Sequence, residues 1–591
     1  VYYSERGKKT KIIDILRAIK KEGVNINEDI LEKTFKVFEK QNEVDYFINK
    51  DAKRFLKEQF DIWLYQYVFS GESEWSEERI KQLQVLKDIA FKIIDFISQF
   101  EDELVKVWNK PKFVLNFNYV ITLDRIADKN IELIEKILTH NNIDNQIKEW
   151  EELRIAADNF DKTKILENNL MDRQLSKKYK HLPIDTKYFK DLELEILGLF
   201  DDLDNTLDGW LIRSENYQAL NTILPKFKEK VQTIYIDPPF NKESDADYFY
   251  SVKYKDASWI TLLENRLQLA KDILNPKGSI FVRCDYNGNM YVRLLLNNVF
   301  ENNNFRNEII VNKSIRIKTE GNKYPSWHDS FLFYSKSFEN AYFKHITKER
   351  EEEEWRSIDT EGESWGFIPE NLLHLFSSEN IKHDEEGRAI SRARIILRQE
   401  ILPRNGRRFP SQETINELEK QNRIRLSTNG NPQMLKPAKI YLTDNWSDIY
   451  GYSSNWNFQT ENSETVLKRI IESTSNEYNL IMDFFLGSGT TIAVAHKLKR
   501  KWIGVEMGEH FYDIILPRMK KVLFYDKSGI SKEKDVKERY NPQNAGGFFK
   551  YYELEQYEDT LRRVKYKDSD LFNDPYAEPY SQYVFMRDPK M

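Results

Sequence analysis

Cysteine is almost absent from this chain, because Cys284 is the only one among 591 residues. A single thiol forms no disulfide within the chain and builds no cysteine-based zinc site, so both of these are excluded. No apolar run approaches the ~20 residues of a bilayer-spanning helix, and the first residues lack the basic-then-apolar pattern of a secretory signal. We therefore expect a cytoplasmic protein with no membrane partner and, from the abrupt start at Val1, trimmed termini.

Several activity-bearing motifs are also missing. The chain has neither a GxxxxGK[ST] phosphate-binding loop nor a recognisable nuclease motif, so translocation or cleavage would need another polypeptide or a missing segment. No repeat of solenoid length is visible. The formal net charge of −6 neither favours nor excludes nucleic acid, because DNA binding depends on where Lys and Arg lie.

The pattern of apolar and charged residues changes along the sequence and predicts an α/β protein built from five segments. Short apolar strands alternate with helices from about residue 206, stop where acidic and then basic runs intervene, and resume near residue 441. The predicted segments are a helical N-terminal domain (1–205), a first core part (206–337), an inserted domain (338–440), a second core part (441–525) and a C-terminal extension (526–591). In the last of these we expect one helix, near 553–563.

The N-terminal segment consists mainly of amphipathic patterns. Apolar residues recur at helical spacing between Ile12 and Ile19 and again between Leu83 and Ile94. The run Phe113 to Leu123 has the composition of a strand. We expect an aromatic stripe to belong to the core: Phe60, Trp63, Tyr65, Tyr67 and Phe69. Two roles stay open for the segment, an arm that clamps DNA or a partner subunit, and a dimerisation scaffold.

The first chemistry-bearing segment is an apolar strand that ends in Asp237, Pro238, Pro239 and Phe240. Two prolines prevent the strand from continuing as a regular ladder, so a rigid loop is expected at its carboxyl end, where open α/β sheets bind ligands. A carboxylate there can accept hydrogen bonds from a flat amine while the aromatic ring stacks on it. In isolation, a simple turn after a buried strand would be the better explanation of the motif, because four-residue motifs recur by chance.

The second segment is a strand, a glycine turn and a helix start between Ile481 and Thr491. Gly487 and Gly489 would let the backbone approach a bound cofactor closely. About 17 residues after the second glycine comes Glu506, at the end of another strand, close to the ~20-residue spacing of a ribose-binding acid. The glycine spacing is not that of a dinucleotide fingerprint. The segment therefore indicates a nucleoside cofactor without a pyrophosphate.

With the proline loop first and the glycine turn about 245 residues later, the chain resembles the beta-class amino-methyltransferases, and more closely the modification (Mod) subunits of type III restriction systems. The resemblance runs from Asn216 to about Arg518 and includes Ser258-Trp259, Arg266 and the strand after Gly278. It implies a Rossmann-like S-adenosylmethionine-dependent methyltransferase core with an inserted target-recognition domain. The implied target-base loop consists of Asp237, Pro238, Pro239 and Phe240. The implied cofactor residues are Asp483, Phe485, Gly487, Gly489, Thr490 and Glu506.

The resemblance further implies N6 methylation of adenine in DNA, because an Asp heads the loop where cytosine enzymes frequently have Ser. The alternatives are a catalytically silent DNA-recognition subunit and an N4-cytosine methyltransferase. Three departures from the family pattern stand out. Ser214-Glu215-Asn216 replaces Gly-Asp-Asn, Asn462-Ser463 replaces a Lys-Pro pair, and Phe484 and Leu486 replace smaller residues. The loss of the lysine removes a cation that can sit near the cofactor carboxylate.

Target recognition is expected of the inserted segment. The target base must be extruded from duplex DNA, so other residues must hold the duplex. The arginines expected to contact phosphates are Arg388, Arg392, Arg404, Arg407 and Arg408, although Arg388 to Arg398 could instead form one solvated helix face. The expected partners are double-stranded DNA, a restriction or translocase subunit, and a second copy of the chain in a homodimer. We expect Cys284, His328 and Asp329 to be structural, and no metal to be bound.

Overall fold

The fold was analysed in a computed structural model of the chain. It describes residues 16, 20–21, 51–69, 77–168, 173–239, 256–313, 322, 324–350, 352–456, 458 and 460–556. Within these ranges no helix is both long enough and apolar enough to cross a membrane. The chain divides into two compact units. The larger unit consists of the chain up to Lys344 and from Asp444 onward, and the smaller unit runs from His345 to Thr443.

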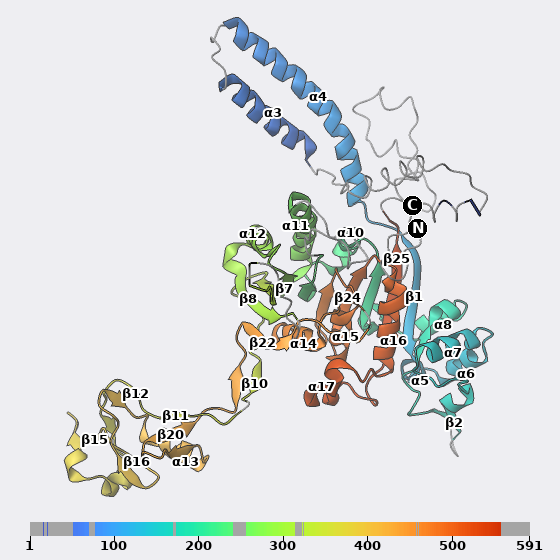
Figure 1. Ribbon diagram of the computed structural model, residues 1–591. Coiled ribbons are helices and arrows are strands. Elements are labelled where there is room, and N and C mark those ends of the chain that lie inside the picture. Colours follow the sequence, from blue (N-terminus) through green and yellow to red (C-terminus); the bar gives the residue numbers. More distant parts are fainter. Residues whose placement is uncertain are drawn as a thin grey trace. The chain divides into compact units, whose positions relative to one another are not determined.

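A mixed eleven-stranded sheet forms the centre of the larger unit (Figure 1), in the order β22-β8-β9-β7-β6-β23-β24-β5-β25-β1-β4. Six adjacent strands run parallel: β7 (Leu274–Cys284), β6 (Val231–Ile236), β23 (Leu480–Asp483), β24 (Lys501–Glu506), β5 (Gly209–Arg213) and β25 (Phe548–Leu554). The predicted α/β class is confirmed by this sheet.

Antiparallel pairings extend the sheet on both sides. Next to β7 lies β9 (His328–Ser335), followed by β8 (Phe305–Asn312), to which β22 (Asn445–Tyr450) pairs in parallel. Beyond β25 lie β1 (Val114–Thr122) and β4 (Pro183–Asp185).

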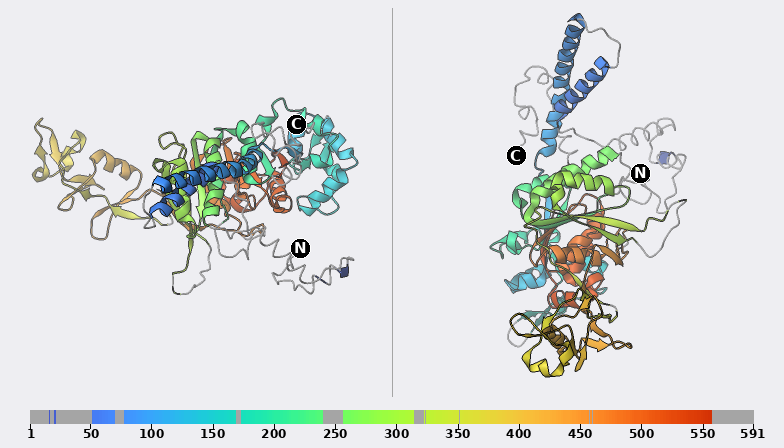
Figure 2. Two further views of the ribbon diagram at one scale, coloured as in Figure 1. Left: turned by 90° about the horizontal axis from the view of Figure 1, so that it is seen from above. Right: turned by 90° about the vertical axis from the view of Figure 1, so that its left-hand side faces the viewer.

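Helices cover both faces of the sheet (Figure 2), and each face has its own apolar core. One core takes in α10 (Asn216–Phe227), α11 (Asp256–Ile273) and α12 (Asn289–Phe300). The other takes in α14 (Glu464–Thr474), α15 (Thr490–Lys497) and α16 (Leu516–Phe524). Successive strand residues point to opposite faces, so Ile234 and Ile236 enter the first core and Tyr235 the second.

The pairing of β6 with β23 brings the two halves of the core together. In this parallel register Thr233 is opposite Ile481 and Ile234 is opposite Met482, although about 245 residues separate the strands. Because parallel strands end at the same edge of a sheet, the loop after β6 and the turn after β23 become neighbours. This is the juxtaposition that the sequence motifs require.

The N-terminal segment is not a separate helical domain. The predicted helix around Leu83 to Ile94 is confirmed as part of α4 (Glu77–Asn109), and α3 (Ala52–Phe69) packs beside it, but β1 and β4 join the central sheet. The short helices between these strands are α5 (Leu123–Ala127), α6 (Ile131–Thr139) and α7 (Ile143–Glu152); α8 (Glu193–Leu197) and α9 (Leu203–Thr206) follow β4. The predicted boundary at residue 205 therefore separates strands that belong to the same sheet. The Ile12–Ile19 pattern lies almost wholly outside the described residues.

The aromatic stripe on α3 is not part of a core, so that prediction is wrong. Trp63, Tyr65 and Phe69 are 49%, 65% and 63% exposed. The physical reason is that α3 packs on α4, and a pair of helices buries only the faces that meet.

The predicted C-terminal extension also contributes to the sheet. The run Phe548–Leu554 forms β25, with a mostly buried pattern, and pairs with β5. The helix expected near 553–563 is wrong at its start, because Glu553 and Leu554 belong to this strand; residues from 557 lie outside the described part.

The smaller unit, His345–Thr443, consists of short antiparallel strands and one longer helix, α13 (Gln412–Lys420). Its strands are β10 (Thr347–Glu349), β11 (Trp355–Ser357), β12 (Thr360–Glu361), β13 (Gly366–Phe367), β14 (Lys382–His383), β15 (Ala389–Ser391), β16 (Arg394–Ile396), β17 (Gln399–Ile401), β18 (Arg407–Arg408), β19 (Ile424–Leu426), β20 (Pro432–Leu435) and β21 (Lys439–Tyr441). Two small apolar clusters, centred on Ile396 and Ile395, form its interior.

Candidate active site

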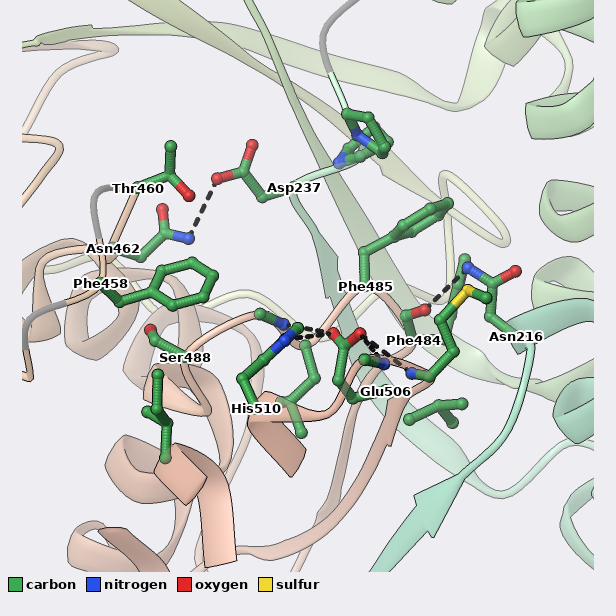
Figure 3. A pocket seen from close by; sticks show the side chains of 18 of the residues that line it. Asn216, Asp237, Phe458, Thr460, Asn462, Phe484, Phe485, Ser488, Glu506 and His510 are labelled. Atoms are coloured by element: carbon green, nitrogen blue, oxygen red, sulfur yellow. Dashed lines mark hydrogen bonds and ion pairs between the residues drawn. The ribbon is translucent and has the colours of Figure 1, made fainter. Parts of the chain in front are cut away.

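A cavity of about 670 Å³ lies at the carboxyl ends of the central parallel strands, a size typical of cofactor sites. Asp237 and Gly487 both line it, so the two motifs share one cavity as the sequence predicts. Figure 3 shows Asp237 and Phe485 on the same cavity as Glu506. The other predicted residues on the wall are Pro238 and Pro239.

The proline loop is anchored from two sides. The indole Nε1 of Trp259 on α11 donates to the carbonyl of Pro239 at 2.8 Å. The Asn462 amide Nδ2 donates to Oδ2 of Asp237 at 3.0 Å (Figure 3). Phe240, expected to stack on the target base, lies outside the described residues.

The glycine turn is shaped by Asp483 at the end of β23. One carboxylate oxygen of Asp483 accepts the backbone N–H of Phe485 at 3.0 Å, and the other accepts the Thr491 hydroxyl at 2.6 Å. Gly487 and Gly489 adopt φ values of +56° and +78°. Side chains rarely adopt this left-handed region, so the two glycines allow the chain to turn directly from strand into helix.

Burial dominates the ionisation of Asp483. The side chain is almost completely buried, and loss of hydration raises its pKa from the ordinary value to about 7, against the hydrogen bonds from Thr491 and Phe485. The negative charges of Asp237 and Glu506 act in the same direction as burial.

Glu506 has the opposite electrostatic environment. Its Oε1 accepts the backbone N–H groups of Met507 at 2.9 Å and Gly508 at 3.0 Å. Its Oε2 accepts the N–H of Gly487 at 2.9 Å and lies 3.4 Å from Nε2 of His510. Burial would raise the pKa of this carboxyl, but the histidine and the backbone donors outweigh burial and lower it. Glu506 is therefore a carboxylate at neutral pH.

Three of the predicted cofactor residues stand behind the cavity wall. Asp483, Gly489 and Thr490 are absent from its lining. The Thr490 hydroxyl accepts a hydrogen bond from the buried Arg518 guanidinium at 2.8 Å. These residues shape the turn, whereas Phe485, Gly487 and Glu506 face the cavity.

Several lining residues were missed in the motif analysis. They come from α11, from the segment before α14 and from the segment after β24, and the main ones are Leu262, Tyr452, Phe458, Thr460, His510 and Ile514. The departures from the family pattern did indicate cavity residues. Those that line the cavity are Ser214 to Asn216, Asn462, Phe484 and Leu486. Arg266 forms an ion pair with Glu215 and donates to the Asn216 side chain, which ties α11 to this wall.

In the smaller unit, the arginines expected to bind DNA lie on or near short strands, so the alternative of a solvated helix face between Arg388 and Arg398 is wrong. Arg388 pairs with Asp384 at 2.8 Å, and Arg392 with Glu363 at 3.2 Å.

Further along the chain, Arg404 and Arg407 both bind the buried carboxylate of Asp359, at 2.7 Å and 3.0 Å. The hydrogen bond from Arg404 is the main reason that the pKa of Asp359 lies well below its ordinary value. Arg408 is exposed on β18 opposite Thr360. The described contacts thus assign structural partners to four of the five arginines.

Comparison with known proteins finds that part of the chain is similar to DNA methylases. Residues 231–517 match the family N6_N4_Mtase, described as DNA methylase. A protein of Haemophilus influenzae, named "Probable type III restriction-modification enzyme HindVI Mod subunit", is 26% identical over 449 residues, which cover 64% of this chain and 58% of the relative. The type II methyltransferase M.EcaI of Enterobacter cloacae is 27% identical over 324 residues, which cover 51% and 67%.

Among solved structures, the complex of M1.HpyAVI with SAM matches with a TM-score of 0.29 and 16% identity, covering 53% of this chain and 98% of that one. The chain spans between about half and two thirds of the length of the curated relatives above. The family match begins at β6, before the proline loop, and ends after the glycine turn and Glu506, so it contains both motifs. Residues 231–517 of this chain are therefore similar to the DNA methylases of the N6_N4_Mtase family.

Proposed function

We propose that the protein is a site-specific DNA methyltransferase that transfers a methyl group from S-adenosylmethionine to the N6 amino group of adenine. The observation that carries the proposal is that Asp237 and the turn around Gly487 line one cavity at the carboxyl edge of the sheet. A carboxylate beside a nucleoside-sized site is the arrangement that a direct transfer to an amine needs.

The residues present fit the cofactor. The ionised Glu506 offers acceptor oxygens for the ribose hydroxyls at the edge of the glycine turn. Phe485 and Leu486 offer apolar surface to a purine ring. When bound, S-adenosylmethionine would supply an electrophilic methyl group on a sulfonium.

The chain's own residues would then orient the target. Asp237 accepts a hydrogen bond from the exocyclic amino group and directs the nitrogen lone pair toward the methyl carbon. As the new nitrogen–carbon bond forms and the carbon–sulfur bond breaks, the amino group gives up one proton, which the same carboxylate can accept. Pro238 and Pro239 keep the carboxylate in place because their ring-locked φ angles leave the loop little freedom.

A methyl-transfer assay with labelled cofactor on mixed-sequence DNA tests the proposal. We expect label in N6-methyladenine on nucleoside analysis, and a loss of at least about 100-fold in Asp237→Ala with cofactor binding retained, because positioning effects reach this size. Glu506→Gln should weaken cofactor binding instead, since its amide group would face the backbone donors. Wild-type protein that binds cofactor tightly without transfer would favour the alternative of a catalytically silent DNA-recognition subunit. Label in N4-methylcytosine would identify the other alternative.

The context of the activity is also part of the proposal. The named Mod relative supports a modification subunit of a restriction or phage-defence system that acts on double-stranded DNA with a restriction or translocase partner. Base flipping follows from the chemistry, because the amino group of a paired adenine is inaccessible in the duplex. We further propose a cytoplasmic homodimer, which light scattering of the purified full chain would test.

A further inference from the structure

Next to Asp237 lies a buried polar cluster whose residues have no role in the methyl transfer proposed above. Arg283, near the end of β7, has a fully buried side chain. Its Nη2 donates to Oδ2 of the buried Asp329 at 2.7 Å, and its Nη1 donates to the Gly451 carbonyl at 3.1 Å and to Oδ1 of Asn462. The guanidinium also lies 3.8 Å from the centre of the Tyr452 ring.

The orientation of the Asn462 amide is decided by this cluster. Its Oδ1 receives two donors, Nη1 of Arg283 and the Tyr235 hydroxyl at 2.9 Å. A guanidinium has only donors, so it cannot face the NH₂ end of the amide. That end must therefore point the other way, where Nδ2 donates to Oδ2 of Asp237 at 3.0 Å (Figure 3).

A positive charge also stands behind the carboxylate, because Nη1 of Arg283 is 3.9 Å from the same Oδ2 of Asp237. One oxygen of the carboxylate thus accepts from a donor whose own orientation is locked by two buried groups. Loss of this donor would remove one restraint on the rotation of the carboxylate, and a misplacement of about 1 Å can cost 100-fold in rate.

We propose that Asn462, locked by Arg283 and Tyr235, is a positioning residue that aims the Asp237 carboxylate at the target amine. The inference rests on the proposed methyl transfer and deepens it. It differs from what the resemblance implies for this position, where the usual lysine would serve the cofactor carboxylate.

The first test separates these two roles by comparing kcat with cofactor affinity in the full-length protein. In Asn462→Ala we expect kcat to fall about 100-fold, with the S-adenosylmethionine Kd within about threefold of wild type. Tyr235→Phe, which removes one of the two locks and does not line the cavity, should lower kcat about 3- to 10-fold, also without a change in Kd. The exposed Asn340→Ala is the matched control and should leave both quantities unchanged. A raised Kd with unchanged kcat would overturn the inference.

A second variant keeps the shape of the side chain. Asn462→Asp retains the oxygens that accept from Arg283 and Tyr235 but faces Asp237 with a second carboxylate, and such a pair shares one proton as the pH falls. The charged and titratable groups around this pair are Tyr235, Arg283, Asp329, Lys313, Tyr452 and Asp483. These groups are present in both proteins, so the ratio of variant to wild-type kcat removes the part of their titration that does not depend on residue 462.

We expect that ratio to rise about tenfold as the pH is lowered from about 8 to about 6, because the shared proton restores the lost hydrogen bond. A ratio that does not change with pH would indicate a merely structural role and overturn the inference. Should wild-type protein itself transfer no methyl group, the proposed function would fail first. Should wild type transfer normally while the variants lose only cofactor affinity, the inference alone would fail.

Discussion

Three acidic residues in one small region of the fold have different hydrogen-bond and charge partners. Asp483 is buried with two neutral donors, and its pKa rises to about 7. Glu506, close by, receives three backbone N–H groups and a histidine, and its pKa falls. Asp237 is held by an amide with a guanidinium behind it. Between the two buried carboxyls Asp483 and Glu506, the number and charge of the donors decide which one has the lower pKa.

The raised pKa of Asp483 predicts a pH-dependent stability that Asp483→Asn removes. In the unfolded chain this carboxyl ionises near pH 4, and in the folded protein near 7. Between these values the folded state binds more protons, so its stability falls as the pH rises, by up to about 1.4 kcal/mol per pH unit, and levels off above both. An asparagine does not titrate, and it can still accept from Phe485 and donate to Thr491.

The thermal unfolding midpoints of the two proteins, measured from pH 5 to pH 8, check this expectation. The midpoint of Asp483→Asn relative to wild type should increase across that range, because only wild type loses the stabilising contribution of this carboxyl there. A difference that stays constant with pH would contradict a raised pKa at Asp483.

At the level of secondary-structure elements, most arginines on the short strands of the smaller unit form contacts within that unit. The β12–β18 pair places Arg407 and Arg408 side by side, yet only Arg407 turns to the buried Asp359. Neighbouring residues on a strand point to opposite faces, so Arg407 binds Asp359 within the unit while Arg408 faces solvent.

The contrast between the arginines that bind Asp359 and the exposed Arg408 predicts different effects for two substitutions. Arg404→Ala should lower the thermal midpoint of the protein, because it leaves the Asp359 carboxylate short of donors, and should leave DNA affinity close to wild type. Arg408→Ala should leave stability unchanged and reduce the slope of log affinity against log salt concentration by about 1, as the loss of one phosphate contact does. Fluorescence anisotropy with a DNA duplex at several salt concentrations measures the slope. An unchanged slope in Arg408→Ala would show that this residue does not contact a DNA phosphate.

At the level of the whole molecule, the smaller unit is one continuous insertion into the larger one. Its two ends lie together, because β10 pairs with β21 so that Thr347 is opposite Tyr441. It also has its own apolar interior. Both features are typical of an autonomous domain.

Deletion of residues 345–443, with a short Gly-Ser linker between Lys344 and Asp444, should therefore leave a folded protein. We expect the S-adenosylmethionine Kd to stay within about threefold of wild type, since every lining residue of the cavity lies in the larger unit. Specific DNA binding should be lost, by about 1000-fold in affinity for a recognised site. Calorimetric titration of both proteins with the cofactor measures the first quantity. A deletion protein that loses cofactor binding would show that the units depend on each other.

The sequence by itself determined the α/β class, the proline loop at Asp237, the glycine turn at Gly487 and the acid at Glu506. Each of these is a local pattern, in which neighbouring residues dictate a strand end, a turn or a helix start. The segment that contains both motifs was therefore predictable.

Only the tertiary structure decided which distant segments join. The placement of β1 and β25 in the sheet, the exposure of Trp63 on α3, and the pairing of Arg404 with Asp359 all depend on contacts between residues far apart in the chain. The same holds for Arg283 behind Asp237. A one-dimensional pattern indicates that a residue is charged or apolar, but the partner that neutralises or buries it is fixed by packing in three dimensions.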